Sequence, residues 1–108
     1  MGVKDYPIML TNEDIIDVKL KTEKNKVIGF AINLRCKIDD AWYAIYRIDT
    51  AHGYLHEQRF WISPEPIKLP TITGMSLKNI FDFYLKHLRK SWRRYKKYYE
   101  ERMKLRCL

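Results

Sequence analysis

Cysteine, glycine and long apolar runs are scarce in this chain of 108 residues, and each scarcity excludes a class of protein. The two cysteines, Cys36 and Cys107, are too few and too far apart for a disulfide framework or a zinc site. The four scattered glycines form no phosphate-binding loop, which excludes nucleotide chemistry of the P-loop or dinucleotide kind. No apolar run approaches the roughly 20 residues of a transmembrane helix, and residues 1–20 lack the pattern of a signal peptide. We therefore expect a cytoplasmic protein with no membrane association and no cofactor.

The residues that are abundant predict a folded chain with one strongly basic end. Hydrophobic residues make up 46% of the sequence and aromatic residues 14%, which is too rich for a disordered protein. A length of 108 residues leaves room for a single domain, residues 1–108. Residues 1–74 hold ten basic and ten acidic residues, whereas residues 75–108 hold 11 basic and three acidic ones. The last third thus carries the whole net charge of +8, which favours a polyanionic partner such as nucleic acid over an ordinary solvated helix face.

Residues 27–62 predict a β-meander because they are dense in Ile, Tyr, Trp and Phe. Two polar breaks, at Asp39-Asp40 and at 51–53, divide this stretch, and Gly53 suits the positive φ of a tight turn. Strands are expected at about residues 27–37, 42–50 and 54–62.

The first of these strands has an apolar period of two, which indicates one buried face. The apolar positions of this alternation are Ile28, Phe30, Ile32, Leu34 and Cys36. Ile16, Val18 and Leu20 predict a fourth strand by the same rule. The alternative for that segment is a short helix capped by Thr11 with Asp14 three residues later.

Residues 63–74 form a proline-rich connector, and residues 75–108 predict one long basic helix with Ser76 as its N-cap. One apolar stripe recurs at helical spacing; it comprises Leu77, Phe81, Tyr84, Leu88, Trp92, Tyr95, Tyr99 and Met103. The predicted fold class is therefore α+β: an antiparallel meander of three or four strands with one long C-terminal amphipathic helix packed on one face.

The predicted helix is longer than the sheet that it covers. Residues 77–104 would span roughly 40 Å as a helix, against roughly 30 Å for strands of nine residues. The overhanging part carries an aromatic stripe that must be covered, either by the N-terminal segments or by a second copy of the chain. We expect a homodimer through the C-terminal helix.

The densest polar cluster lies around the predicted second hairpin, and it suits acid–base chemistry. If His52-Gly53 forms a two-residue loop, Asp49 lies opposite His56 and Arg47 opposite Gln58. If the loop has three residues, the register slips and Arg47 faces Glu57 instead. Two histidines and nearby cations are sufficient for metal-free cleavage of RNA. The candidate catalytic residues are Arg47, Asp49, His52, His56 and Arg59. In the alternative interpretation these cross-strand pairs only stabilise the sheet. No metal ligand set is predicted, because the histidines lie in no zinc-binding pattern.

The predicted helix offers a second candidate surface, opposite its apolar stripe. Basic side chains there suit phosphate contacts, and an aromatic ring beside them suits base stacking. The candidate nucleic-acid-binding residues are Lys86, Lys90, Arg93, Arg94, Lys97 and Tyr98.

The run from Tyr46 to His56 resembles the Arg-Tyr-Asp…His-x-x-x-His core of a small prokaryotic family that includes uncharacterised archaeal proteins and, more distantly, the TumE-like toxins of toxin–antitoxin pairs. The similarity covers residues 27–62; Ile48 stands where the family has an aromatic residue. The resemblance implies a small cytoplasmic protein that acts on RNA and has an antitoxin-like protein partner.

Two functions follow from these observations. The first is a small basic protein directed at nucleic acid, preferably RNA, that acts as a metal-independent endoribonuclease of toxin type. The alternative is a dimeric nucleic-acid-binding or protein-interaction module without catalysis.

Overall fold

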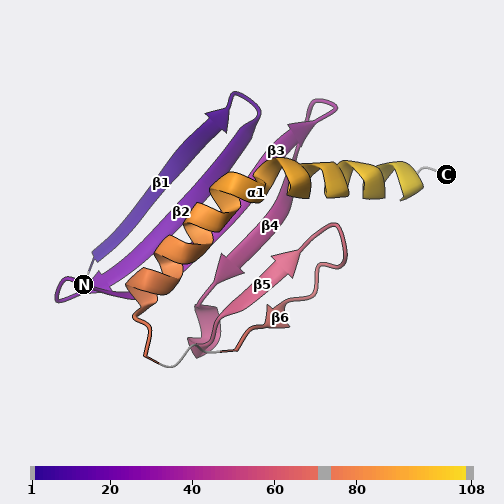
Figure 1. Cartoon of the computed structure of the whole chain (residues 1–108). Helices are drawn as coiled ribbons and strands as arrows, with labels where there is room; N and C mark the ends of the chain where they lie inside the picture. Colours follow the sequence, from indigo (N-terminus) through magenta and orange to yellow (C-terminus); the bar gives the residue numbers. More distant parts are fainter. Residues whose placement is uncertain (1, 71–73, 107–108) are drawn as a thin grey trace.

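The fold is α+β, with a six-stranded antiparallel sheet and one long helix packed on it (Figure 1). The computed structural model describes residues 2–70 and 74–106. The elements are β1 (Gly2–Thr11), β2 (Asp14–Glu23), β3 (Lys26–Ile38), β4 (Ala41–Asp49), the 3₁₀ turn η1 (Ala51–Gly53), β5 (His56–Arg59), β6 (Ile67–Lys68) and α1 (Leu77–Arg106). Within the described ranges, no helix is both long and apolar enough to cross a membrane.

The sheet is a meander whose strand order follows the chain from β1 to β6. Six strands replace the three or four expected, because β1 and β6 were not predicted. β1 is an edge strand that is exposed along most of its length, so it lacks the apolar alternation by which a strand is recognised. β6 is only two residues long and lies within the stretch predicted to be a connector.

Of the two alternatives for residues 14–20, the strand is correct. Asp14–Glu23 forms β2, which lies between β1 and β3 in the sheet. The spacing of Thr11 and Asp14 serves a β-turn instead of a helix start. The Thr11 hydroxyl donates to the Asp14 carboxylate and accepts a hydrogen bond from Glu13 N at 3.0 Å.

The second predicted hairpin is more irregular than expected. Gly53 has a φ of +81°, as its place in a tight turn predicts. It belongs to η1, however, and not to a two-residue loop. The strand expected at residues 54–62 is correspondingly shorter, because β5 spans only His56–Arg59.

The apolar face of β3 packs against α1, as its period of two predicts, except at one position. Phe30, Ile32, Leu34 and Cys36 are buried in the core. Ile28 is 42% exposed, because a register irregularity lets Lys21 pair with Gly29 and Thr22 with Val27 and leaves Ile28 without a partner in β2.

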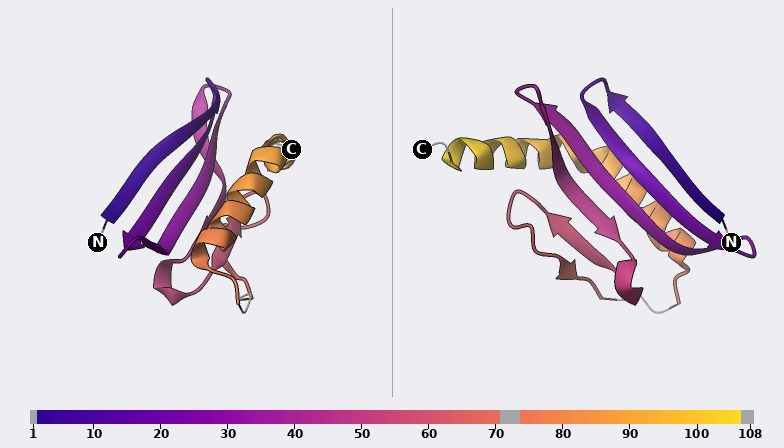
Figure 2. Two further views of the ribbon diagram at one scale, coloured as in Figure 1. Left: turned by 60° about the vertical axis from the view of Figure 1, so that its left-hand side comes forward. Right: turned by 180° about the vertical axis from the view of Figure 1, so that it is seen from behind.

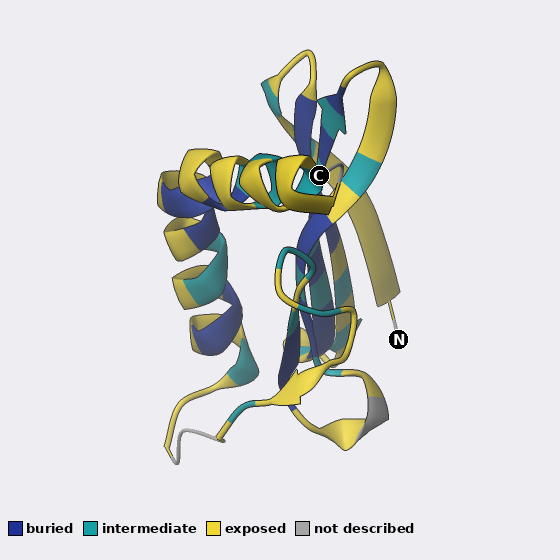
Figure 3. Cartoon of the chain, turned by 90° about the vertical axis from the view of Figure 1, so that its right-hand side faces the viewer, coloured by how far each residue is buried: buried dark blue, intermediate teal, exposed yellow. Residues whose placement is uncertain are grey.

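α1 begins where the sequence predicts and buries the predicted stripe. Asn79 N donates to Ser76 Oγ at 3.1 Å, which makes Ser76 the N-cap. All eight stripe residues are in the core or packed against it. The C-terminal end of α1 projects past the sheet (Figure 1), and its last turns are mostly exposed (Figure 3).

The overhanging aromatic stripe is covered largely by the chain itself. The ring of Tyr43 on β4 lies 5.6 Å from that of Tyr99. Trp61, from the connection between β5 and β6, lies 5.0 Å from Tyr95. The stripe therefore does not require a second copy, and a homodimer through α1 stays a prediction.

The helix covers one face of the sheet, and none of the elements in the described ranges covers the opposite face (Figure 2). Because side chains alternate between the faces of a strand, each candidate residue on β4 and β5 belongs to one face or the other. Ile48 faces the helix and is fully buried, so its neighbours Arg47 and Asp49 belong to the uncovered face.

Candidate nucleic-acid interface

The register between β4 and β5 brings the predicted acid–imidazole pair together. Asp49 lies opposite His56 and Arg47 lies opposite Gln58, which is the first of the two predicted registers. Asp49 Oδ1 lies 2.7 Å from His56 Nε2. Arg47 Nε donates to Asp49 Oδ2 at 2.6 Å. Three of the five predicted catalytic residues, Arg47, Asp49 and His56, therefore form one cluster.

The carboxylate at the centre of this cluster is buried and saturated with partners. Asp49 is 4% exposed. Besides Arg47 and His56 it accepts a hydrogen bond from Ala51 N at 3.0 Å. The other ring nitrogen of His56, Nδ1, lies 3.4 Å from the carbonyl oxygen of Tyr54. Each polar group of the cluster thus contacts protein, which is typical of a network that fixes a strand connection.

Arg59 is separated from this cluster by the sheet. It pairs with Tyr46, whose side chain is buried on the helix side, and its Nε lies 2.9 Å from Glu57 Oε1. Glu57 is buried and also accepts a hydrogen bond from the Tyr46 hydroxyl at 2.7 Å. Burial and this bond to Glu57 raise the pKa of Tyr46. The sequence predicts Glu57 only as a partner of Arg47 in the second register, although its spacing of two from Arg59 places both on one face.

His52, the fifth predicted catalytic residue, has a described backbone only. It lies in η1, the turn that joins β4 to β5. Its side chain lies outside the described part of the structure, so its predicted role stays a prediction. Among the described residues, no group of three or more His, Cys, Asp or Glu is placed to hold a metal ion.

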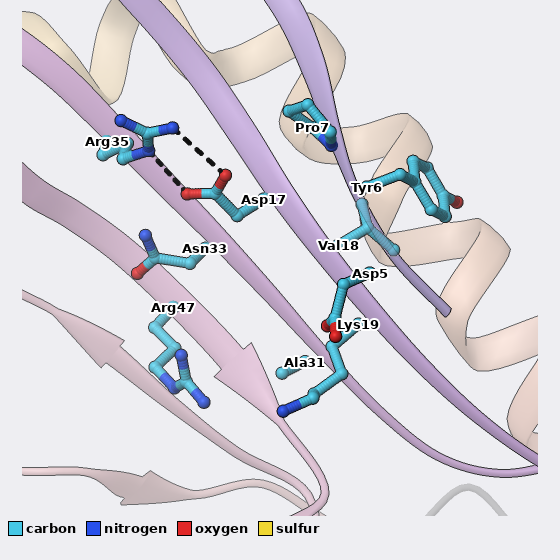
Figure 4. Close-up of a pocket in the computed structure, with 10 residues that line it drawn as sticks. All are labelled: Asp5, Tyr6, Pro7, Asp17, Val18, Lys19, Ala31, Asn33, Arg35 and Arg47. Atoms are coloured by element: carbon cyan, nitrogen blue, oxygen red, sulfur yellow. Dashed lines mark hydrogen bonds and ion pairs between the residues drawn. The ribbon is translucent and has the colours of Figure 1, made fainter. Parts of the chain in front are cut away.

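The uncovered face of the sheet carries cations around two shallow hollows. The larger hollow, of about 360 Å³, is shown in Figure 4 and extends from β1 to Arg47 on β4. In it Arg35 Nε is paired with Asp17 Oδ2 at 2.7 Å. The second hollow, of about 330 Å³, lies beside it and contains Lys19, Lys21, Arg47 and Asp49. Lys19 and Lys21 were not predicted as site residues; their alternation along β2 is the signal that could have identified them.

All six predicted nucleic-acid-binding residues are exposed, on the other side of the molecule from Asp49. They are Lys86, Lys90, Arg93, Arg94, Lys97 and Tyr98. Lys86, Lys90, Arg93 and Lys97 follow one line along α1 at intervals of three or four residues, and we call them the cationic ridge. None of the four belongs to an ion pair within the described part of the chain.

Lys96, which lies next to the ridge in sequence, has a structural contact instead. Its Nζ lies 2.8 Å from Oδ1 of Asp14, the first residue of β2. Burial raises the pKa of Asp14, but hydrogen bonds from Lys96, Thr11 and Cys36 outweigh burial and leave the pKa below its ordinary value of 3.8. Lys96 therefore forms an ion pair within the fold and does not belong to the exposed basic surface of α1.

The chain matches a family model described as Domain of unknown function (DUF7718) over residues 1–105. No curated protein matches the chain, and neither does any solved structure.

Proposed function

The chain belongs to the DUF7718 family, and we propose that it binds nucleic acid, preferably RNA, through the exposed cations of α1. The cationic ridge carries this proposal. Four positive side chains lie on one line over 12 residues, or about 16 Å of helix. At a rise of about 3.4 Å per nucleotide, that length faces about five phosphates of one strand.

The absence of neutralising partners supports a role in binding for the ridge. A lysine on a merely solvated helix face gains from a carboxylate one turn away, as Lys78 does at 2.7 Å from Asp82. Lys90 and Arg93, in the middle of the ridge, have no carboxylate within one turn, because residues 83–99 contain no acidic residue. At its ends, Lys86 and Lys97 have Asp82 and Glu101 four residues away, yet neither cation forms an ion pair among the described residues. Neighbouring cations without ion pairs repel each other, which is unfavourable for the free protein. A bound polyanion reduces this repulsion.

The test compares a variant in which three ridge lysines are replaced with a control variant in which three exposed lysines elsewhere are replaced. Lys86→Gln, Lys90→Gln and Lys97→Gln together should weaken binding of a single-stranded RNA oligonucleotide. They should also reduce the slope of log K against log salt by about 2, because each lost phosphate contact removes about 0.7. The matched control combines Lys4→Gln, Lys24→Gln and Lys26→Gln, which changes the net charge equally away from α1. Equal weakening by both variants, or no binding by the unaltered chain at low salt, would contradict the proposal.

A second candidate function, metal-independent RNA cleavage, is favoured by one observation on the uncovered face. Arg47 has a side chain that is 40% exposed and lines a hollow with Lys19, Lys21 and Asp49. A phosphate in this hollow would meet three cations within one sheet face. An antitoxin-like protein partner is proposed only together with this activity.

Cleavage is tested with purified protein in EDTA, beside His52→Ala and His56→Ala proteins whose folding is checked by thermal melting. Cleavage that either substitution abolishes in a folded protein supports catalysis at the β4–β5 connection. Equal behaviour of all three proteins, with salt-sensitive RNA retention, leaves binding alone. Failure of both cleavage and binding would direct attention to a protein partner.

A further inference from the structure

We propose that the groove between α1 and the connection from β5 to β6 is a stacking site for one unpaired base of single-stranded RNA. This inference rests on the proposed nucleic-acid binding and adds a preference for single strands. The groove is a hollow of about 450 Å³, lined by Trp61, Ile62, Tyr98, Glu101, Arg102 and Leu105.

Two aromatic rings give the groove its stacking surface. Tyr98 is 40% exposed, and its ring centroid lies 5.7 Å from that of Trp61. Trp61 also packs against Tyr95, with the ring centroids 5.0 Å apart at an interplanar angle of 30°. Tyr95 is itself buried in the core. The platform is therefore anchored to the fold, and a base that stacks on Tyr98 does not have to order a loose side chain first.

The charges around Tyr98 specify what the groove holds. Arg94 and Arg102 lie one helical turn before and after Tyr98 and are exposed, so they are placed for the phosphates on either side of a stacked base. Glu101 and Arg102 both line the groove. A carboxylate repels a phosphate but accepts a hydrogen bond from the amino group of a base. A base in the groove would therefore meet Glu101, while Arg102 at the groove and Arg94 one turn before Tyr98 would contact the flanking phosphates.

The groove also continues the cationic ridge. Lys97 of the ridge is the residue next to Tyr98, so a strand that follows the ridge reaches the groove without leaving α1. Bases in a duplex are paired and stacked and cannot enter, whereas a single strand can turn a base into the groove. The ridge then supplies binding that is common to both forms, and the groove adds binding for single strands alone.

The experiment compares Tyr98→Leu with Tyr98→Phe on two RNA probes, a 12-nucleotide oligoadenylate and an RNA duplex of 12 base pairs. Tyr98→Leu removes the ring and should weaken oligoadenylate binding about tenfold while leaving duplex binding unchanged. Tyr98→Phe keeps the ring and should bind both probes like the unaltered chain. Thermal melting establishes that both variants are folded.

Three results would overturn the inference. The first is that Tyr98→Leu binds oligoadenylate as well as the unaltered chain does, and the second is that it weakens the binding of both probes equally. The third is that Tyr98→Leu converts a dimer into a monomer in light scattering, which would show that a second copy fills the groove through exposed residues such as Ile62 and Leu105. Failure of the proposed function has a different signature, because then the unaltered chain binds neither probe or the three ridge lysines are dispensable for both.

Discussion

Asp49 and His56 face each other across the pair of β4 and β5, and Asp49 Oδ1 lies 2.7 Å from His56 Nε2. The same carboxylate accepts hydrogen bonds from Arg47 Nε and Ala51 N. Asp49 therefore joins two strands and the turn between them. The cluster stabilises the pairing of β4 with β5 at the point where β5 is short and the connection is irregular.

Asp49→Asn should lower the free energy of unfolding by about 2–3 kcal/mol, because a neutral amide replaces a buried carboxylate that accepts a hydrogen bond from the charged Arg47 side chain. Asp17→Asn is the matched control. Asp17 also pairs with an arginine of the uncovered face, Arg35, but its side chain is 42% exposed. An exposed pair contributes less than about 1 kcal/mol. Urea denaturation at pH 7 measures the loss in the free energy of unfolding for each variant. Equal losses would contradict the structural role assigned to Asp49.

The sequence predicts part of this site because strand geometry is regular. Once Asp49 is placed opposite His56, the period of two puts Arg47 on the same face. The same rule moves Arg59 to the other face, because the register that joins Arg47 to Gln58 joins Tyr46 to Arg59. The spacing of two also puts Glu57 beside Arg59. The burial of Glu57 and its bond to Tyr46 depend on how α1 covers this face, and strand spacing alone does not contain that information.

Cys36 should be chemically inert in the native protein. It is fully buried in β3, and burial together with a hydrogen bond to Asp14 raises its pKa well above that of a free thiol. The thiolate is the reactive form, so alkylation is suppressed in the folded state. In a Cys107→Ser background we expect no labelling by iodoacetamide at pH 8 and complete labelling in urea. Rapid labelling without denaturant would show that the sheet and helix open locally around Cys36.

The Tyr46 hydroxyl should stabilise the buried carboxylate of Glu57. Tyr46→Phe leaves Glu57 with one donor fewer, and we expect a loss of about 1–2 kcal/mol. Tyr43→Phe, at a half-buried tyrosine of the same strand, should change stability by less than about 0.5 kcal/mol. Because the folded state raises the pKa of Tyr46, the contribution of this group is present below pH 10 and is lost as the pH rises further. Denaturation curves from pH 7 to 11 should therefore converge for Tyr46→Phe and the unaltered chain.

The difference between α1 and β1 shows why some elements are predictable from sequence and others are not. α1 buries one side along most of its length, so its apolar residues repeat at helical spacing from Leu77 to Met103. β1 is held by its hydrogen bonds to β2, and most of its side chains stay exposed. Backbone hydrogen bonds require no particular pattern of side chains. The sequence of an edge strand of this kind therefore resembles that of a charged linker.

Lys96 should be the most important single lysine of α1 for stability, although it contributes nothing to the cationic ridge. Lys96→Met leaves the buried Asp14 carboxylate without its cation, and we expect a loss of about 2–3 kcal/mol at pH 7. Lys97→Met is the matched control, since Lys97 is exposed and belongs to no ion pair among the described residues. It should change stability by less than about 0.5 kcal/mol while weakening RNA binding.

The pH dependence of this pair identifies the charge as the cause. Burial raises the pKa of Asp14, but its bonds to Lys96, Thr11 and Cys36 lower the pKa further and keep it below 3.8 in the folded state. A depressed carboxyl pKa contributes stability that is present above the unfolded value and lost as the pH falls through the folded value. The difference in the free energy of unfolding between Lys96→Met and the unaltered chain should therefore be largest at pH 5–7 and decrease below pH 4. A difference in the free energy of unfolding that stays constant down to pH 2 would mean that Lys96 acts through the packing of its hydrocarbon stem.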